Sequence, residues 1–148
     1  MGATTIPLKR RAAAFALALL ACAAVGSVAQ TQFNLGDLSA LGVEIPFPVR
    51  AQTTVRDLAG FAPLYALVVA VGLLPAFIVA GLLSGTAGSR RAPLYLLAGG
   101  VAVWASLQSA NALAGVPVLV FATRHAAGLA CLVAGGVLAG WIYQRRTR

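Results

Sequence analysis

The chain has 148 residues, of which 60% are hydrophobic and only 9% are charged, and its mean hydropathy is +0.90. A water-soluble domain needs more polar surface to cover its core, so this composition excludes an ordinary soluble fold and predicts an integral membrane protein. A net charge of +8 would indicate nucleic-acid binding in a soluble domain. Here we assign the cations to membrane topology and expect no nucleic-acid partner.

The membrane-spanning segments follow from length and composition, since a helix needs about 20 apolar residues to cross a bilayer. Four segments qualify, at residues 12–29, 58–83, 93–114 and 121–143. We therefore predict one all-α membrane domain over residues 1–148. Its expected architecture is an antiparallel four-helix transmembrane bundle with an ordered extracytoplasmic segment between the first two spans.

The first span has two interpretations. It follows the basic triplet KRR (9–11) and ends in SVA (27–29), as a secretion signal cleaved before Gln30 would. The stretch LLAC (19–22) also has the outline of a weak lipoprotein signal. However, the apolar run reaches spanning length, whereas a signal core has about 7 to 15 residues. We favour a retained helix, and a cleaved signal would leave three spans.

The segment 30–57 is the one long polar stretch, and it contains all three acidic residues, Asp37, Glu44 and Asp57. Leucines recur every three residues from Leu35 to Leu41, which predicts one or two turns of a short helix.

Residues 43–49 instead alternate apolar with polar or proline residues, which predicts a half-buried extended strip. Pro46 and Pro48 cannot donate to a sheet ladder, so we expect an extended lid across the outer ends of the helices. It either rests on the bundle as an amphipathic linker or gates the bundle and docks a partner. Thr54 and Asp57 have the spacing of a helix N-terminus, about one turn outside the membrane.

Orientation follows from the cations, because loops rich in Lys and Arg stay in the cytoplasm. In a four-span topology only Arg50, Arg56 and Arg124 fall on one side, and the other eight cations fall on the opposite side. Both termini are therefore predicted to be cytoplasmic. The excess of Arg over Lys, with abundant Ala and Gly, is typical of a bacterial source, so we expect the bacterial inner membrane.

Two features inside the spans could carry function. In the third span, Gln108, Ser109 and Asn111 form a polar cluster, and Gln108 and Asn111 share a helix face. We favour hydrogen bonds between helices as their role, with a small polar cavity as the alternative. In the second span, Pro75 predicts a kink, which either lines a cavity or shapes the bundle.

Arg124 and His125 form the sharpest feature, since an unpaired guanidinium inside a bilayer is costly. We expect VPVLVF (116–121) to be an interfacial or re-entrant piece and the fourth span to begin near Phe121, which leaves Arg124 at the outer interface. A candidate outer-face polar site follows, made of Arg124, His125, Asp57 and Glu44. An interfacial anchor or a structural ion pair, for which Asp37 is a further acidic partner, is favoured over a contact with an anion, lipid headgroup or substrate.

The fourth span carries a stripe of small residues that predicts close helix packing through Gly135, Gly136 and Gly140, within the bundle or against a partner chain. Cys22 and Cys131 both lie in apolar runs, so we interpret them as packing residues rather than a disulfide.

A single histidine excludes a haem held by two histidines, and no span contains a carboxylate for a proton relay. We therefore predict no catalytic residue, no cofactor and no metal. The favoured function is a non-catalytic accessory or assembly component in the lipid bilayer, packed against another membrane protein or a second copy. The alternative is a small oligomeric channel or transporter with a path past Pro75, Gln108 and Asn111.

Overall fold

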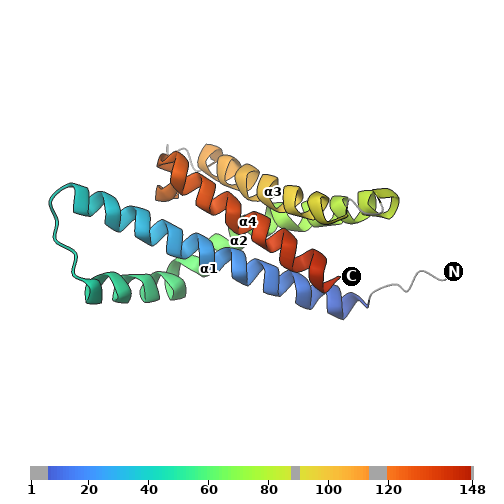
Figure 1. Cartoon of the computed structure of the whole chain (residues 1–148), viewed down its shortest axis with the longest axis horizontal. Helices are drawn as coiled ribbons and strands as arrows, with labels where there is room; N and C mark the ends of the chain where they lie inside the picture. The colour runs from blue at the N-terminus through green and yellow to red at the C-terminus, as the bar shows by residue number, and fades with distance from the viewer. Residues whose placement is uncertain (1–6, 88–90, 114–119, 148) are drawn as a thin grey trace.

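The computed structural model describes residues 7–87, 91–113 and 120–147 (Figure 1). All regular structure in these ranges is helical, in the order α1 (Leu8–Ala40), α2 (Phe47–Ala87), α3 (Arg91–Leu113), the short 3-10 helix η2 (Phe121–Arg124) and α4 (Ala126–Arg146). The four α-helices are each long and apolar enough to cross a membrane. The predicted all-helical class is therefore confirmed, as is the presence of four helices that could span a membrane.

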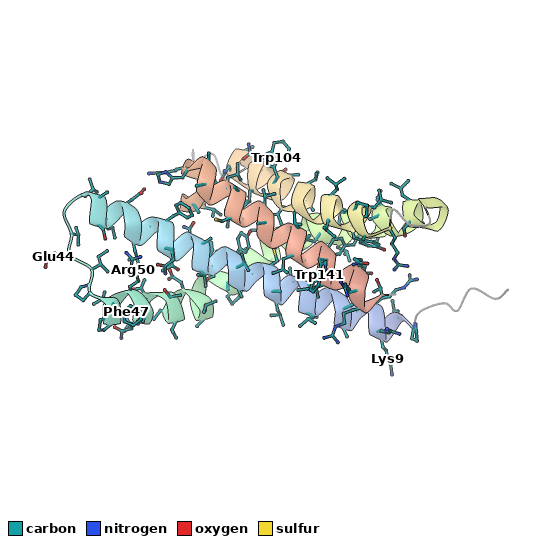
Figure 2. All side chains as sticks on the ribbon, viewed as in Figure 1. Lys9, Glu44, Phe47, Arg50, Trp104 and Trp141 are labelled. Atoms are coloured by element: carbon teal, nitrogen blue, oxygen red, sulfur yellow. The ribbon has the colours of Figure 1, made fainter. Side chains whose placement is uncertain are left out.

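Each α-helix packs mainly against two others, so that α1 and α3 both contact α2 and α4. Hydrogen bonds tie three helix ends together. Arg10 Nε donates to the carbonyl oxygen of Arg146 at 3.0 Å, and Arg91 Nη2 donates to the carbonyl oxygen of Thr147. We name this the basic end, because its described residues include six cations: Lys9, Arg10, Arg11, Arg91, Arg145 and Arg146. Lys9 and Trp141 lie there in Figure 2, and Glu44 and Phe47 lie at the opposite end.

Small side chains explain how closely α1 approaches its neighbours. Ala14, Ala18, Cys22 and Gly26 recur every fourth residue and are buried along one face of α1. The opposite face is exposed, as at Leu20, whose exposure is 65%. An exposed leucine is unfavourable in water but is the expected surface of a helix in lipid. The buried face therefore packs on protein, and the exposed face has the chemistry of a bilayer-facing surface.

The closest helix contact joins α3 to α4 through glycines. A Cβ added to Gly136 would lie 2.3 Å from the carbonyl oxygen of Gly99, and one added to Gly140 would lie 2.0 Å from that of Tyr95. At Gly135 the nearest atom to an added Cβ is Val25 Cγ1 of α1, at 3.3 Å. The glycines of α4 thus face other helices of the same chain.

The connection between α1 and α2 differs from the prediction. Helix α1 continues to Ala40 and α2 begins at Phe47, so the extended strip expected over residues 43–49 is wrong for residues 47–49, which are helical. The lid expected from this segment stays a prediction. At about 1.5 Å per residue, α1 and α2 extend about 50 and 62 Å, well beyond an apolar bilayer core of about 30 Å.

Gly42 and Pro46 explain why the helices stop and start where they do. Gly42 has φ +88°, and the Val43 and Gly42 amides donate to the carbonyl oxygens of Leu38 and Ser39. This is the Schellman arrangement of a helix C-terminus. At the start of α2, the Pro46 carbonyl oxygen accepts from the amides of Val49 and Arg50.

Pro48 sits in the first turn of α2, where a missing amide hydrogen breaks no helical hydrogen bond. Thr54 is not near a helix start, because its hydroxyl donates back to the carbonyl oxygen of Arg50 inside α2. The helix N-terminus expected at Thr54 and Asp57 is therefore also wrong.

Two further expectations concern α2 and α4. Helix α2 is continuous through Pro63 and Pro75, and the kink at Pro75 stays a prediction. Helix α4 begins at Ala126 rather than near Phe121, because η2 occupies 121–124. Most of the expected re-entrant piece, residues 116–119, lies outside the described residues.

Candidate functional site

The polar hairpin, which we define as residues 30–57, gathers most of the described polar contacts between helices. It comprises the end of α1, the connection 41–46 and the start of α2. Figure 1 shows that it forms the end of the molecule opposite the start of α1 and the end of α4.

A ladder of side-chain hydrogen bonds joins the two arms of the polar hairpin. Thr31 Oγ1 lies 2.6 Å from Asp57 Oδ2 and shares its hydrogen with the carbonyl oxygen of Ser27 at 2.9 Å. Gln32 Nε2 donates to Thr54 Oγ1, and Gln32 Oε1 accepts from Arg50 Nη1, both at 3.0 Å. The ladder forms because Arg50, Thr54 and Asp57 recur on one face of α2.

His125 attaches the start of α4 to the outer arm of α1. Its Nε2 lies 2.8 Å from Asp37 Oδ2, and its ring stacks on Phe33 with a centroid distance of 5.8 Å. Nearby, the backbone amide of Ala122 in η2 donates to Gln30 Oε1 at 2.7 Å. These contacts close the bundle at this end.

The four residues of the predicted outer-face site are not brought together as one site. His125 pairs with Asp37, whereas Asp57 belongs to the ladder with Thr31. Glu44 is exposed in the connection 41–46, and Arg124 is exposed at the end of η2. In the described contacts, the pairing of His125 with Asp37 therefore closes the bundle. The predicted members are divided, with Asp57 and Glu44 in the polar hairpin and Arg124 and His125 before α4.

The tip of the polar hairpin exposes apolar side chains. Leu41 and Phe47 are 81% and 80% exposed, and Val43 and Val49 are 49% and 48% exposed. Phe47 lies close to Glu44 at the end of the molecule in Figure 2. We refer to Leu41, Val43, Phe47 and Val49 as the apolar tip.

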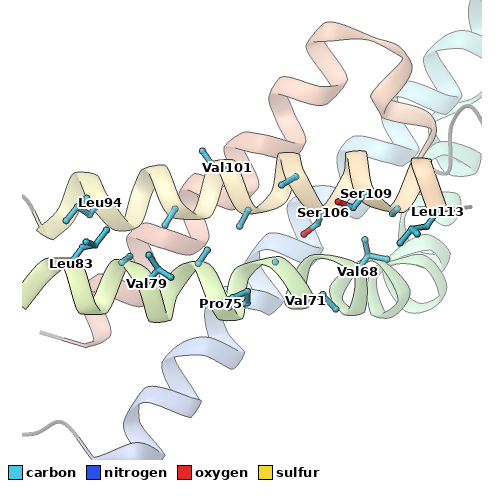
Figure 3. A pocket seen from close by; sticks show the side chains of 17 residues that line it. Val68, Val71, Pro75, Val79, Leu83, Leu94, Val101, Ser106, Ser109 and Leu113 are labelled. Carbon is cyan, nitrogen blue, oxygen red and sulfur yellow. The ribbon is translucent and has the colours of Figure 1, made fainter.

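A groove of about 710 Å³ runs between α2 and α3 (Figure 3). Its lining includes Pro75, which agrees with one of the two alternatives for this residue, and two polar side chains, Ser106 and Ser109. Gly72 makes room for Ser106, because a Cβ at Gly72 would lie 2.2 Å from Ser106 Oγ. The remaining lining side chains are apolar.

Two members of the predicted polar cluster lie away from this groove. Gln108 is exposed and Asn111 is half-buried, and neither is among the groove-lining residues. A path past Pro75 along the groove would therefore meet Ser106 and Ser109 instead.

Aromatic side chains fill the bundle next to the basic end. The Phe77 ring stacks on Tyr143 with centroids 4.7 Å apart and meets Tyr95 and Phe15 edge-on. Arg91 lies over the Tyr95 ring, 5.6 Å from its centroid. The cysteines differ from each other, since Cys22 is buried and Cys131 is exposed, so a packing role within the chain applies to Cys22.

Sequence reasoning missed the ladder partners Thr31 and Gln32 and the apolar tip. Arg50, Thr54 and Asp57 recur at helical spacing, but the expected extended strip over residues 43–49 and the expected helix start at Thr54 leave Arg50 outside the helix. A helical interpretation of residues 47–57 would have placed these three side chains on one face.

The chain was compared with protein-family models, curated proteins and solved structures, and none of them matches it. Its function must therefore be argued from its own residues.

Proposed function

We propose that the chain is a non-catalytic accessory protein of the bacterial cytoplasmic membrane that binds a partner protein through its apolar tip. In this proposal the four helices cross the bilayer as an antiparallel bundle, with both termini in the cytoplasm and the polar hairpin outside. Neither a catalytic residue nor a cofactor enters the proposed role.

The distribution of charge supports this orientation. Six described cations gather at the basic end, which matches the cytoplasmic excess of Lys and Arg in membrane proteins. All three acidic residues belong to the polar hairpin at the other end. Ionised side chains are costly in hydrocarbon, so the hairpin, with Asp37, Arg50 and Asp57, belongs in water.

The apolar tip is the observation that carries the proposal. Exposed leucines and valines on the spans are solvated by lipid, but the tip lies in the charged segment, where lipid does not cover it. Phe47 and Leu41 are each at least 80% exposed there. A cluster of exposed apolar side chains among polar ones marks an interaction site in proteins.

The ladder makes the hairpin suitable for binding. Hydrogen bonds from Thr31, Gln32 and Arg50 hold its two arms together before any partner arrives. A preorganised surface loses less conformational entropy on binding than a flexible one.

The glycine stripe of α4 and the α2/α3 groove support a function less well than the apolar tip does. The glycines of α4 face α1 and α3, so they are already used within the chain. The transport alternative receives less support, because Gln108 and Asn111 do not line the groove that passes Pro75.

Affinity purification from native membranes in a mild detergent tests the proposal. The wild-type chain should recover a stoichiometric partner, and the double variant Leu41→Ser with Phe47→Ser should lose it. Val55→Ser is the matched control, because Val55 is 66% exposed on the same hairpin but lies two turns from the tip. Unchanged helicity by circular dichroism establishes that the variants fold. Wild-type chain recovered alone, or equal recovery of the partner with the tip variant, refutes the proposal.

A further inference from the structure

The groove between α2 and α3 has a floor of small side chains and a rim of large ones. The rim is exposed, with Val71 at 78% and Leu113 at 88%. The floor is partly or fully buried and comprises Gly72, Ala76, Ala80, Ala98 and Ala102. Because the small residues recur at helical spacing on both helices, the hollow follows the helix axes. Figure 3 shows it running from Val68 and Leu113 to Leu83 and Leu94.

The length and the lining of the groove fit an acyl chain. Between Val68 and Leu83 the axis of α2 advances about 22 Å, at about 1.5 Å per residue. Apart from Ser106 and Ser109, the side chains that line the groove are apolar. The groove therefore offers a hydrocarbon chain an apolar surface along its whole length. Its length exceeds the depth of one bilayer leaflet, about 15 Å.

One end of the groove lies at the basic end of the bundle. Leu83 and Leu94 line this end and lie opposite each other (Figure 3). Arg91 is not itself a lining residue, but it is one helical turn from Leu94 and so lies just beyond this end. Arg91 is held in place, with Nη2 bonded to Thr147 and its guanidinium over the ring of Tyr95. These partners are neutral, and Arg91 Nε is buried without a hydrogen-bond partner in the described part of the chain.

The basic end has no acidic side chain to balance this charge, since the chain's three carboxylate side chains all belong to the polar hairpin. A half-buried guanidinium whose partners among the described residues are neutral attracts an anion, and phosphate is the anion that membranes offer at this depth. Basic pockets between helices on the cytoplasmic side are known to bind anionic lipid headgroups.

We propose that the α2/α3 groove binds an anionic phospholipid, with one acyl chain along the groove and the phosphate beside Arg91. The small floor residues receive the chain, and the exposed valines and leucines of the rim enclose it. The second acyl chain remains in the surrounding bilayer. This site is separate from the apolar tip and does not depend on the partner proposed above.

Native mass spectrometry of the purified full chain measures this directly. The chain is titrated with phosphatidylglycerol or phosphatidylethanolamine, and bound copies are counted. One phosphatidylglycerol should be retained in preference to phosphatidylethanolamine. Arg91→Gln should weaken phosphatidylglycerol binding about fivefold, as expected for one basic residue at an anionic surface, and leave phosphatidylethanolamine unchanged.

The matched control for charge is Arg145→Gln. Arg145 lies at the same end but over the ring of Trp141, 5.1 Å from its centroid, on α4 away from the groove. Loss of Arg145 should leave the preference intact. Ala105→Phe adds a ring within the groove and should reduce the retention of both lipids. Arg91→Lys keeps the charge and should keep the preference, which provides a folded comparison if the Gln variant is unstable.

Three results would overturn the proposal. They are the absence of any preference for phosphatidylglycerol in the wild-type chain, equal effects of the Arg91 and Arg145 variants, and unchanged lipid retention in Ala105→Phe. The tip variant with Leu41→Ser and Phe47→Ser should retain the lipid normally, so that loss of partner binding and loss of lipid binding are distinguishable.

Discussion

Gly136 offers the sharpest test of the packing in this bundle. An added Cβ there would lie 2.3 Å from the carbonyl oxygen of Gly99 and 2.6 Å from Val103 Cγ2. Ordinary contact distances between such atoms are about 3.5 Å, so α3 and α4 would have to separate by about 1 Å. Neither helix can yield locally, because the obstructing oxygen belongs to backbone.

The expected magnitude of Gly136→Ala combines two opposing terms. Overpacking costs about 1 to 3 kcal/mol, and we expect the upper part of this range because the clash is with backbone. Replacing glycine by alanine inside a helix gains about 1 kcal/mol of intrinsic propensity. The net result is a loss of about 1 to 2 kcal/mol in the free energy of unfolding.

Gly60→Ala is the matched control, because an added Cβ at Gly60 of α2 has no neighbour within 4 Å. This variant has the same gain in helix propensity but no clash. The difference between the two variants in the free energy of unfolding therefore measures the cost of overpacking alone. Both free energies are measured by denaturant titration in detergent micelles, followed by circular dichroism. If Gly136→Ala is as stable as Gly60→Ala, α3 and α4 are not packed as described.

Two further predictions concern the ends of α1. Gly42→Ala should lower the free energy of unfolding by about 1 to 2 kcal/mol, because φ +88° is unfavourable for an L-residue, whereas Gly36→Ala in open space should not destabilise the chain. Equal stability of the two variants in a denaturant titration would contradict the turn geometry. The intact mass of the purified protein should include residues 12–29, because Ala18 and Cys22 of that stretch are buried in the core. A mass that corresponds to a chain starting at Gln30 would instead identify a cleaved signal.

The spans could be predicted from the sequence because they depend on length and apolar content alone. The ends of the helices could not be predicted, because the same leucine and proline patterns are compatible with more than one backbone conformation. Pro46 and Pro48 fit extended structure, yet both are equally compatible with the start of a helix. The leucine spacing correctly indicates helix at Leu35 and Leu38, but Leu41 lies just past the end of α1, and the continuity of this helix with the first span is not apparent from the spacing.

The candidate sites were harder to predict than the helices. Whether Asp37 or Asp57 pairs with His125 depends on how α1 and α2 are rotated about their axes, which no local pattern specifies. The groove forms where small residues of α2 meet small residues of α3. It cannot be predicted from either helix alone, because its shape depends on how the two helices pack. Gln108 was predicted from polarity alone, and polarity does not indicate which face of a helix meets a cavity.

The two long helices differ in mechanical character. From Leu8 to Ala40, α1 is continuous and contains no proline, so it resists bending between the basic end and the polar hairpin. Helix α2 covers a similar path but contains Pro63 and Pro75, each of which removes a backbone hydrogen bond and softens the helix against bending. A force applied at the apolar tip would therefore be absorbed mainly by flexing of α2, and Pro75 would pass that flexing to the wall of the groove.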